Sequence, residues 1–137
     1  MADVLSPKQR RYCMSRIRGK DTKPEMIVRK LVFALGFRYR LHVRDLPGCP
    51  DLVFPAKRKA ILVHGCFWHR HSCSNGRVVP RTRRAFWLKK LEGNKKRDAR
   101  NRRALRKKGW DVLVIWECQT DRTERLIERL HAFLDDC

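Results

Sequence analysis

Near the end of the chain, residues 112–116 read Val-Leu-Val-Ile-Trp, an almost unbroken apolar run. A strand with one face in water alternates apolar and polar side chains, whereas an unbroken run is typical of a strand buried on both faces. Burying both faces of a sheet requires a layer of helices on each side. The run therefore predicts an α/β fold.

The rest of the chain supplies helices and further strands for such a fold. Thr22 can cap a helix, Pro24 suits its first turn, and Glu25 can complete a capping box, so a helix is expected from there to Gly36. The other expected strands, bounded by Pro/Gly turns, cover residues 37–41, 51–54 and 60–63. A basic helix is expected over about 83–107 and an amphipathic helix over 126–134.

The order of these elements, αβββαβα, predicts one mixed sheet flanked by helices. Residues 1–20 are basic and weakly patterned, so we expect an N-terminal arm or short helix there, followed by a single domain over 21–137. No apolar run approaches the roughly 20 residues of a membrane span. The first 20 residues also lack the apolar stretch of a signal peptide, so we expect a soluble, intracellular protein.

The charge balance points to a polyanionic partner. The chain has 34 Lys and Arg against 14 Asp and Glu, a formal net charge of +20. Residues 77–108 alone carry 15 basic residues and two acids. Such a stretch can be a solvated helix face, but so few acids favour contact with phosphates. Nucleic acid is the first candidate partner, and an acidic membrane surface is the second.

Residues 64–73, His-Gly-Cys-Phe-Trp-His-Arg-His-Ser-Cys, combine three histidines, two cysteines and two large aromatics. Imidazole and thiolate are zinc ligands, and the spacing Cys66-x4-His71-x-Cys73 supplies three of the four that a structural site needs. Cys118 follows the strand at 112–116 and is the expected fourth ligand. The alternative is buried thiols beside a surface histidine. The adjacent aromatics suit stacking on bases.

Asp51 follows Pro50 at the start of a predicted strand, where many metal-dependent nucleases place a Mg2+ ligand. A Pro-Asp pair alone often only makes a turn. The acid-x-Lys that usually follows in such nucleases is missing, because the next strand reads Ala-Ile-Leu-Val-His over residues 60–64. If the chain is a nuclease, a backbone carbonyl and histidines must replace that acid and lysine.

Several motifs together resemble the very short patch repair endonucleases, bacterial DNA mismatch enzymes related to restriction nucleases. They are Pro50-Asp51, the run His64-Gly65-Cys66-Phe67-Trp68-His69, His71-x-Cys73, Phe86-Trp87-Leu88 and Trp116-Glu117-Cys118. The resemblance extends from about residue 9 to residue 134. It implies a restriction-endonuclease-like mixed sheet with a structural zinc site, in a protein of the bacterial cytoplasm.

The implied activity is a nick 5′ to the thymine of a T·G mismatch, which starts very short patch repair of deaminated 5-methylcytosine. The expected partner is double-stranded DNA with that mismatch, and mismatch repair proteins are candidate further partners. We expect a monomer, because the enzyme cuts one strand of an asymmetric site. The implied cofactors are catalytic Mg2+ and structural Zn2+.

The resemblance also implies residue roles. Asp51 would bind Mg2+ through its carboxylate and Val63 through its main-chain carbonyl. His69 would be the general base with His64 beside it, and Glu25 and Asp98 would hold a water on the metal or hold the histidine. The implied zinc ligands are Cys66, His71, Cys73 and Cys118. The side chains implied to enter the base stack are Phe67, Trp68 and Trp87 from the major groove and Met14 from the opposite groove.

Simpler interpretations stand beside some of these roles. Glu25 can be only a capping residue, Asp98 can relieve a crowded basic helix, Trp87 can belong to the core, and Met14 can be ordinary helix packing. One member of Phe86-Trp87-Leu88 is expected in the core. The remaining histidines, His42 and His131, lie outside every cluster and are expected at the surface or in packing.

Two positions depart from the family pattern. Val63 stands where the family commonly has threonine, a change that a main-chain carbonyl ligand tolerates. Arg70 and Ser72 interrupt what is often a longer histidine run, yet His69 and His71 remain. Two other functions stay open: a non-catalytic zinc-containing DNA-binding module, and a restriction-type nuclease without mismatch preference. The module would leave Asp51 and two histidines without a task.

Overall fold

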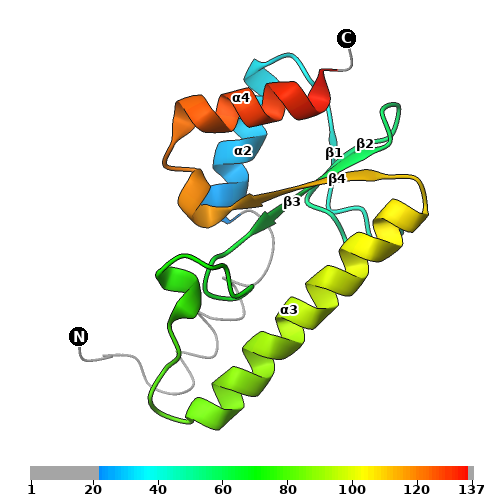
Figure 1. Ribbon diagram of the computed structural model, residues 1–137. Coiled ribbons are helices and arrows are strands. Elements are labelled where there is room, and N and C mark those ends of the chain that lie inside the picture. The colour runs from blue at the N-terminus through cyan, green and yellow to red at the C-terminus, as the bar shows by residue number, and fades with distance from the viewer. Residues whose placement is uncertain (1–21, 136–137) are drawn as a thin grey trace.

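The structure is a computed structural model that describes residues 22–135 (Figure 1). The described helices are α2 (Lys23–Ala34), α3 (Arg84–Lys107) and α4 (Thr123–Leu134). The strands are β1 (Arg40–Leu41), β2 (Leu52–Phe54), β3 (Lys59–His64) and β4 (Asp111–Trp116), and short 3-10 turns cover Asn75–Arg77 and Glu117–Gln119. The expected N-terminal arm, with Met14, lies outside the described residues.

The strands form one mixed sheet in the order β1-β2-β3-β4. The first two pairings are antiparallel, and β3 pairs with β4 in parallel, so that Val63 lies opposite Ile115 and His64 opposite Trp116. The parallel pairing needs a crossover, which α3 provides. The predicted small α/β domain with a single mixed sheet is confirmed.

Helices α2 and α4 lie side by side against one face of the sheet (Figure 1). Their inward residues meet strand residues such as Ile61 and Ile115 in one apolar core. Helix α2 begins as predicted, because the Thr22 hydroxyl accepts a hydrogen bond from the Glu25 backbone N–H at 3.4 Å. The turn after this helix contains Gly36 at φ +95°, in the left-handed region that favours glycine.

The prediction that β4 is buried on both faces is wrong. Only Ile115 in this strand is fully buried, and Val112, Val114 and Trp116 are half-buried. Among the described elements, α2 and α4 share the core on the face that carries Ile115, whereas α3 contacts β4 but leaves Val112, Val114 and Trp116 only half-buried. Its apolar run therefore does not report two closed faces.

Helix α3 is a 24-residue rod that extends beyond the body of the domain (Figure 1). Its bounds agree with the predicted basic helix, and Gly109 at φ +87° follows its end. Only Leu91 and Leu105 of this helix are fully buried, so most of its basic side chains are at the surface. Among the helices between residues 22 and 135, none is long and apolar enough to span a bilayer.

Candidate active site

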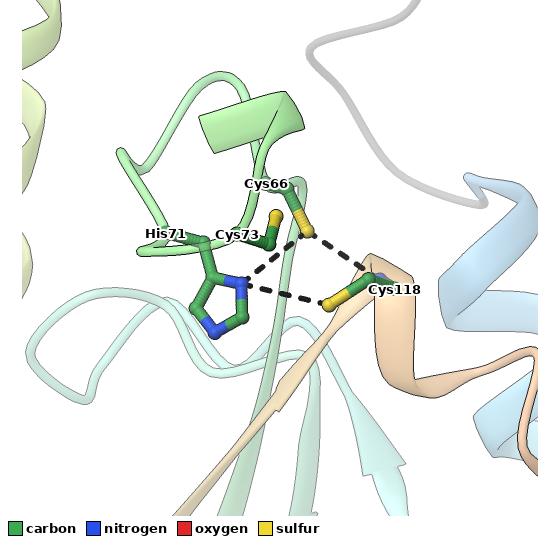
Figure 2. Close-up of side chains that lie close together, drawn as sticks. All are labelled: Cys66, His71, Cys73 and Cys118. Carbon is green, nitrogen blue, oxygen red and sulfur yellow. Dashed lines mark hydrogen bonds between the residues drawn. The ribbon is translucent and has the colours of Figure 1, made fainter. Parts of the chain in front are cut away.

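The four predicted zinc ligands come together where β3 and β4 end (Figure 2). The loop after β3 carries Cys66, His71 and Cys73, and Cys118 reaches them from the turn after β4. His71 Nδ1 lies 3.8 Å from Cys66 Sγ and 3.5 Å from Cys118 Sγ. One ligand atom from each residue lies within 4.8 Å of all the others.

This Cys/His cluster fits a four-coordinate structural zinc site. Ligands held at about 2.0–2.3 Å from one tetrahedral zinc lie about 3.5–3.8 Å from each other, and the two distances from His71 Nδ1 to the sulfurs of Cys66 and Cys118 are in this range. The hydrogen bond to His71 lowers the pKa of the Cys73 thiol to about 6, whereas burial raises that of the Cys66 thiol to about 12. The Cys118 backbone N–H also donates to Cys66 Sγ at 3.4 Å. Zinc binding itself stays a prediction.

Gly76 is required by the loop that carries these ligands. A Cβ at this position would lie 1.9 Å from the main-chain oxygen of His71 and 2.6 Å from its nitrogen, so the His71 backbone would have to shift. We expect Gly76→Ala to weaken zinc binding by about tenfold or more, as displaced ligand geometry does in metal sites. Competition with a chromophoric chelator measures this affinity.

Gly93→Ala is the matched control, because nothing lies within 4 Å of a Cβ built on this helical glycine. Alanine in the helix should leave zinc affinity unchanged and add roughly 0.5–1 kcal/mol of stability. Wild-type zinc affinity in Gly76→Ala would show that the loop does not hold the metal as described.

A second cluster joins His64, His69 and Asp98. The ring Nδ1 of His69 lies 2.5 Å from Asp98 Oδ2, which α3 supplies. The rings of His64 and His69 stack at 3.9 Å between centroids, with 6° between their planes. Asp98 thus does more than relieve charge in a basic helix, because it holds a predicted catalytic histidine.

His64 is an uncharged member of this pair at neutral pH. Burial, with the neighbouring His69, lowers its pKa to about 3. Within residues 22–135, its buried Nδ1 has no hydrogen-bond partner. The His64 ring also meets Trp116 edge-on at 5.2 Å, and Trp116 stacks on His71 of the Cys/His cluster at 4.3 Å. The tryptophan therefore packs between the two clusters.

A third cluster contains Glu25, His42 and Asp51. Ligand atoms of the three lie within 4.8 Å of one another. Val63 donates its backbone N–H to Asp51 Oδ2 at 2.7 Å, which fixes the carboxylate against β3. Burial raises the pKa of Asp51 to about 7, and the charge of Glu25 adds to this effect.

This Glu25/His42/Asp51 cluster fits a divalent cation. Carboxylate oxygens are preferred ligands of Mg2+, and the buried Glu25 and half-buried Asp51 carboxylates, when both are charged this close together, repel each other unless positive charge lies between or beside them. The predicted catalytic residues form two groups, with His64, His69 and Asp98 in one and Glu25 and Asp51 in the other. Mg2+ binding stays a prediction.

The predicted base-stacking residues form one aromatic group. Phe67 lies 5.1 Å from Trp68 and 5.8 Å from Trp87, centroid to centroid, and the two tryptophans are 5.9 Å apart. All three are half-buried, so Trp87 is not a core residue. The prediction that one residue of Phe86-Trp87-Leu88 belongs to the core is wrong. Phe86 is 44% exposed, and none of the three is buried. Leu91 on the next turn fills the core instead.

A basic pocket of about 220 Å3 opens beside the second cluster. His69 and Asp98 line it together with three cationic side chains, those of Arg70, Lys95 and Arg102. Side chains of this kind attract a phosphate by charge. The pocket therefore places positive charge next to His69, whose Nδ1 is held by the Asp98 carboxylate.

Sequence reasoning missed His42, which was expected at the surface or in packing. Its Nε2 lies 2.9 Å from Glu25 Oε2, inside the cluster around Asp51. The strand register could have found it: Leu41 pairs with Leu52, so His42 is the next residue out and lies opposite Asp51. His131 lies on α4, 3.6 Å from Asp135, with its side chain more than half exposed.

The chain is similar to several known proteins. A family model described as DNA mismatch endonuclease Vsr matches residues 2–75. The type II nicking enzyme V.XorIIP of Xanthomonas oryzae pv. oryzae is 47% identical over 135 residues, 98% of each chain. The type II nicking enzyme V.NmeAIP of Neisseria meningitidis is 40% identical over 98% of this chain and 95% of its own. The DNA mismatch endonuclease Vsr of Escherichia coli is 40% identical over 93% and 81%.

Matches of this extent place the chain among the DNA endonucleases. Within that class, it belongs to the DNA mismatch endonuclease Vsr family, which confirms the family resemblance carried by its motifs.

Proposed function

We propose that this protein is a Mg2+-dependent endonuclease that nicks DNA 5′ to the thymine of a T·G mismatch and so starts very short patch repair. The observation that carries the proposal is the His69–Asp98 pair, 2.5 Å apart at the edge of a basic pocket. A DNA-binding module has no need of a histidine held in this way. Hydrolysis of a phosphodiester does, because it requires a base for the attacking water.

His69 acts as that base through Nε2. Asp98 accepts the hydrogen of Nδ1–H, which fixes the tautomer and leaves the Nε2 lone pair free to take a proton from water. The stacked His64 ring limits rotation of the His69 ring and adds no charge of its own near neutral pH. Proton transfer to a positioned side chain contributes about 10²–10⁴-fold to the rate of such reactions.

The Asp51 carboxylate and the Val63 main-chain carbonyl would hold the metal. Mg2+, when bound, neutralises charge on the phosphodiester and makes water more acidic. The Val63 N–H keeps the Asp51 carboxylate at the end of β3, one residue from His64. Strand β3 thus connects the two groups, because Val63 contacts Asp51 and the next residue, His64, belongs to the histidine cluster.

The aromatic group and α3 would bind the DNA. Half-exposed Phe67, Trp68 and Trp87 offer faces to bases, and Asn94 of α3 donates to the Trp68 carbonyl at 3.1 Å and so anchors the loop. Lys90 lies about 6 Å from two of these rings. Inserting such side chains beside a T·G pair costs less unstacking energy than in matched duplex, which is a source of mismatch selectivity.

A panel of end-labelled duplexes tests the proposal. With Mg2+ present, we expect a single nick 5′ to the thymine in the T·G duplex and none in its T·A counterpart. Equal cleavage of the two would instead identify a nuclease without mismatch preference. Binding without cleavage of either would identify a non-catalytic module.

Replacing Asp98 by asparagine tests the role given to the acid. The amide oxygen can still accept Nδ1–H, but the amide carries no negative charge to stabilise a positive imidazole, so we expect nicking to slow by about 10–100-fold with DNA binding intact. Single-turnover rates on the T·G duplex measure the change. Glu92→Gln makes the same acid-to-amide change on α3, at a half-exposed partner of Arg70, and should cost little. Equal rates for the two variants would remove Asp98 from the mechanism.

A further inference from the structure

We propose that His42 is a positioning residue of the catalytic centre, which holds Glu25 beside Asp51 and so increases the affinity of this cluster for a divalent cation. The inference rests on the proposed function only for the expected effect of His42 on DNA nicking. Its structural basis is that His42, the residue directly after β1, contacts both acids of the cluster, Glu25 through its side chain and Asp51 through its main chain.

The main chain of His42 is bonded to that of Asp51. Arg40 pairs with Val53 and Leu41 with Leu52, and the ladder continues by one more hydrogen bond, from the His42 N–H to the Asp51 carbonyl at 3.1 Å. This bond ties the start of β2 to the end of β1. The position of the Asp51 backbone therefore depends on the conformation of His42.

The side chain of His42 is directed at Glu25. Its Nε2 lies 2.9 Å from Oε2 and 3.0 Å from Oε1, so one N–H bridges both oxygens of the carboxylate. We assign the hydrogen to Nε2, because carboxylate oxygens accept the hydrogen bond in this pairing. Glu25 is 2% exposed and the His42 side chain 12%, which leaves little room for water to replace this contact. Arg29 adds a longer contact, 3.4 Å from Nη1 to Oε2.

The backbone of His42 is in an unfavourable conformation. Its φ is +48°, in the left-handed region that residues with a Cβ adopt rarely. Strain of this kind persists where surrounding contacts determine it, and it is often found at functional sites. Here the two contacts that determine it are the bond to the Asp51 carbonyl and the bridge to Glu25.

The arrangement has a consequence for metal binding. The carboxylates of Glu25 and Asp51 repel each other, and without His42 the Glu25 side chain is free to turn away towards Arg29. A site with two carboxylates already in place binds a cation more tightly than one that must assemble them. Hydrogen-bonded partners of metal ligands typically contribute 10–100-fold in affinity.

Calorimetric titration with Mn2+ tests this role on zinc-loaded protein, without DNA. We expect His42→Ala to weaken Mn2+ binding by about tenfold. His42→Gln, whose side-chain NH2 can reach the Glu25 carboxylate, should recover most of the loss. The control is His131→Ala, which removes an exposed imidazole from α4 and should bind Mn2+ as the wild type does. The Mg2+ concentration for half-maximal nicking of the T·G duplex should shift in the same order.

Wild-type Mn2+ affinity in His42→Ala would overturn the inference. Mn2+ binding as weak in His42→Gln as in His42→Ala would also overturn it, because the effect of the imidazole would then not come from its hydrogen bond to Glu25. If His42→Ala melts below the assay temperature, the Mn2+ affinities of His42→Gln and His42→Leu are compared instead. The inference then requires tighter Mn2+ binding by His42→Gln, which can donate a hydrogen bond, than by His42→Leu, which cannot. Weaker Mn2+ binding in a protein whose wild type nicks no duplex would support the inference and refute the proposed function, so the two failures are distinguishable.

Discussion

Replacing His69 by alanine is expected to slow single-turnover nicking of a T·G duplex by about 10²–10⁴-fold and to leave DNA affinity nearly unchanged. The variant removes the only group to which the proposal assigns the proton of the attacking water. The aromatic group and the basic side chains of α3, which would supply the binding energy, remain in place. A rapid-quench assay with excess enzyme measures the rate, and fluorescence anisotropy measures the affinity.

His69→Asn separates the base from its surroundings. Asparagine places a polar atom near the position of Nδ1 and so keeps a contact with Asp98, but it has no atom at Nε2. Both variants should lose activity to a similar extent. If nicking by His69→Asn stayed near the wild-type rate, the general base would have to be another group.

Removing a ligand of the Cys/His cluster should have the other large effect. We expect one zinc per wild-type chain, and Cys66→Ala should lose the metal and lower the melting temperature, because structural zinc contributes on the order of 10 kcal/mol of binding free energy. Cys66 is fully buried where its sulfur meets His71 and the Cys118 N–H, so its loss also leaves a cavity. Elemental analysis and thermal unfolding give the two readouts.

Cys49→Ala provides the comparison for that variant, since Cys49 is an exposed thiol outside the cluster. It should keep one zinc and the wild-type melting temperature. Unchanged zinc content in Cys66→Ala would contradict the assignment of the cluster. Equal loss in Cys49→Ala would mean that the metal bound to the protein is not held there.

Patterns local in sequence predicted much of the fold. Thr22 and Gly36 mark the bounds of α2, and α3 was predicted almost to the residue, because caps and helical periodicity are properties of neighbouring residues. The apolar run of β4 predicted a strand correctly but its environment incorrectly. The helices packed on each side decide how far the faces are closed, and a run of side chains does not report how completely a distant helix covers it.

The residues of the candidate site that lie together in one segment were predicted from the sequence. A residue that joins the site only through the pairing of strands was missed. The spacing of Cys66, His71 and Cys73 indicated a common centre, and the structure brings Cys118 to it. His42 has no informative neighbours in sequence and joins the site only through the register of β1 with β2. The spacing around Asp98 indicated only one acid in a basic helix, and its expected role of holding the histidine came from the family resemblance; the tertiary fold places it against His69.

Titration of Mg2+ into zinc-loaded protein with a T·G duplex tests the central claim most directly, that the Cys/His cluster is structural and the catalytic cation is held at Asp51. Protein with one zinc per chain, in buffer freed of other divalent cations, should leave the duplex intact. Added Mg2+ should then produce a single nick 5′ to the thymine in the wild type but not in Asp51→Ala. Full nicking by the zinc-loaded protein without Mg2+, or Mg2+-dependent nicking by Asp51→Ala at the wild-type rate, would contradict the account.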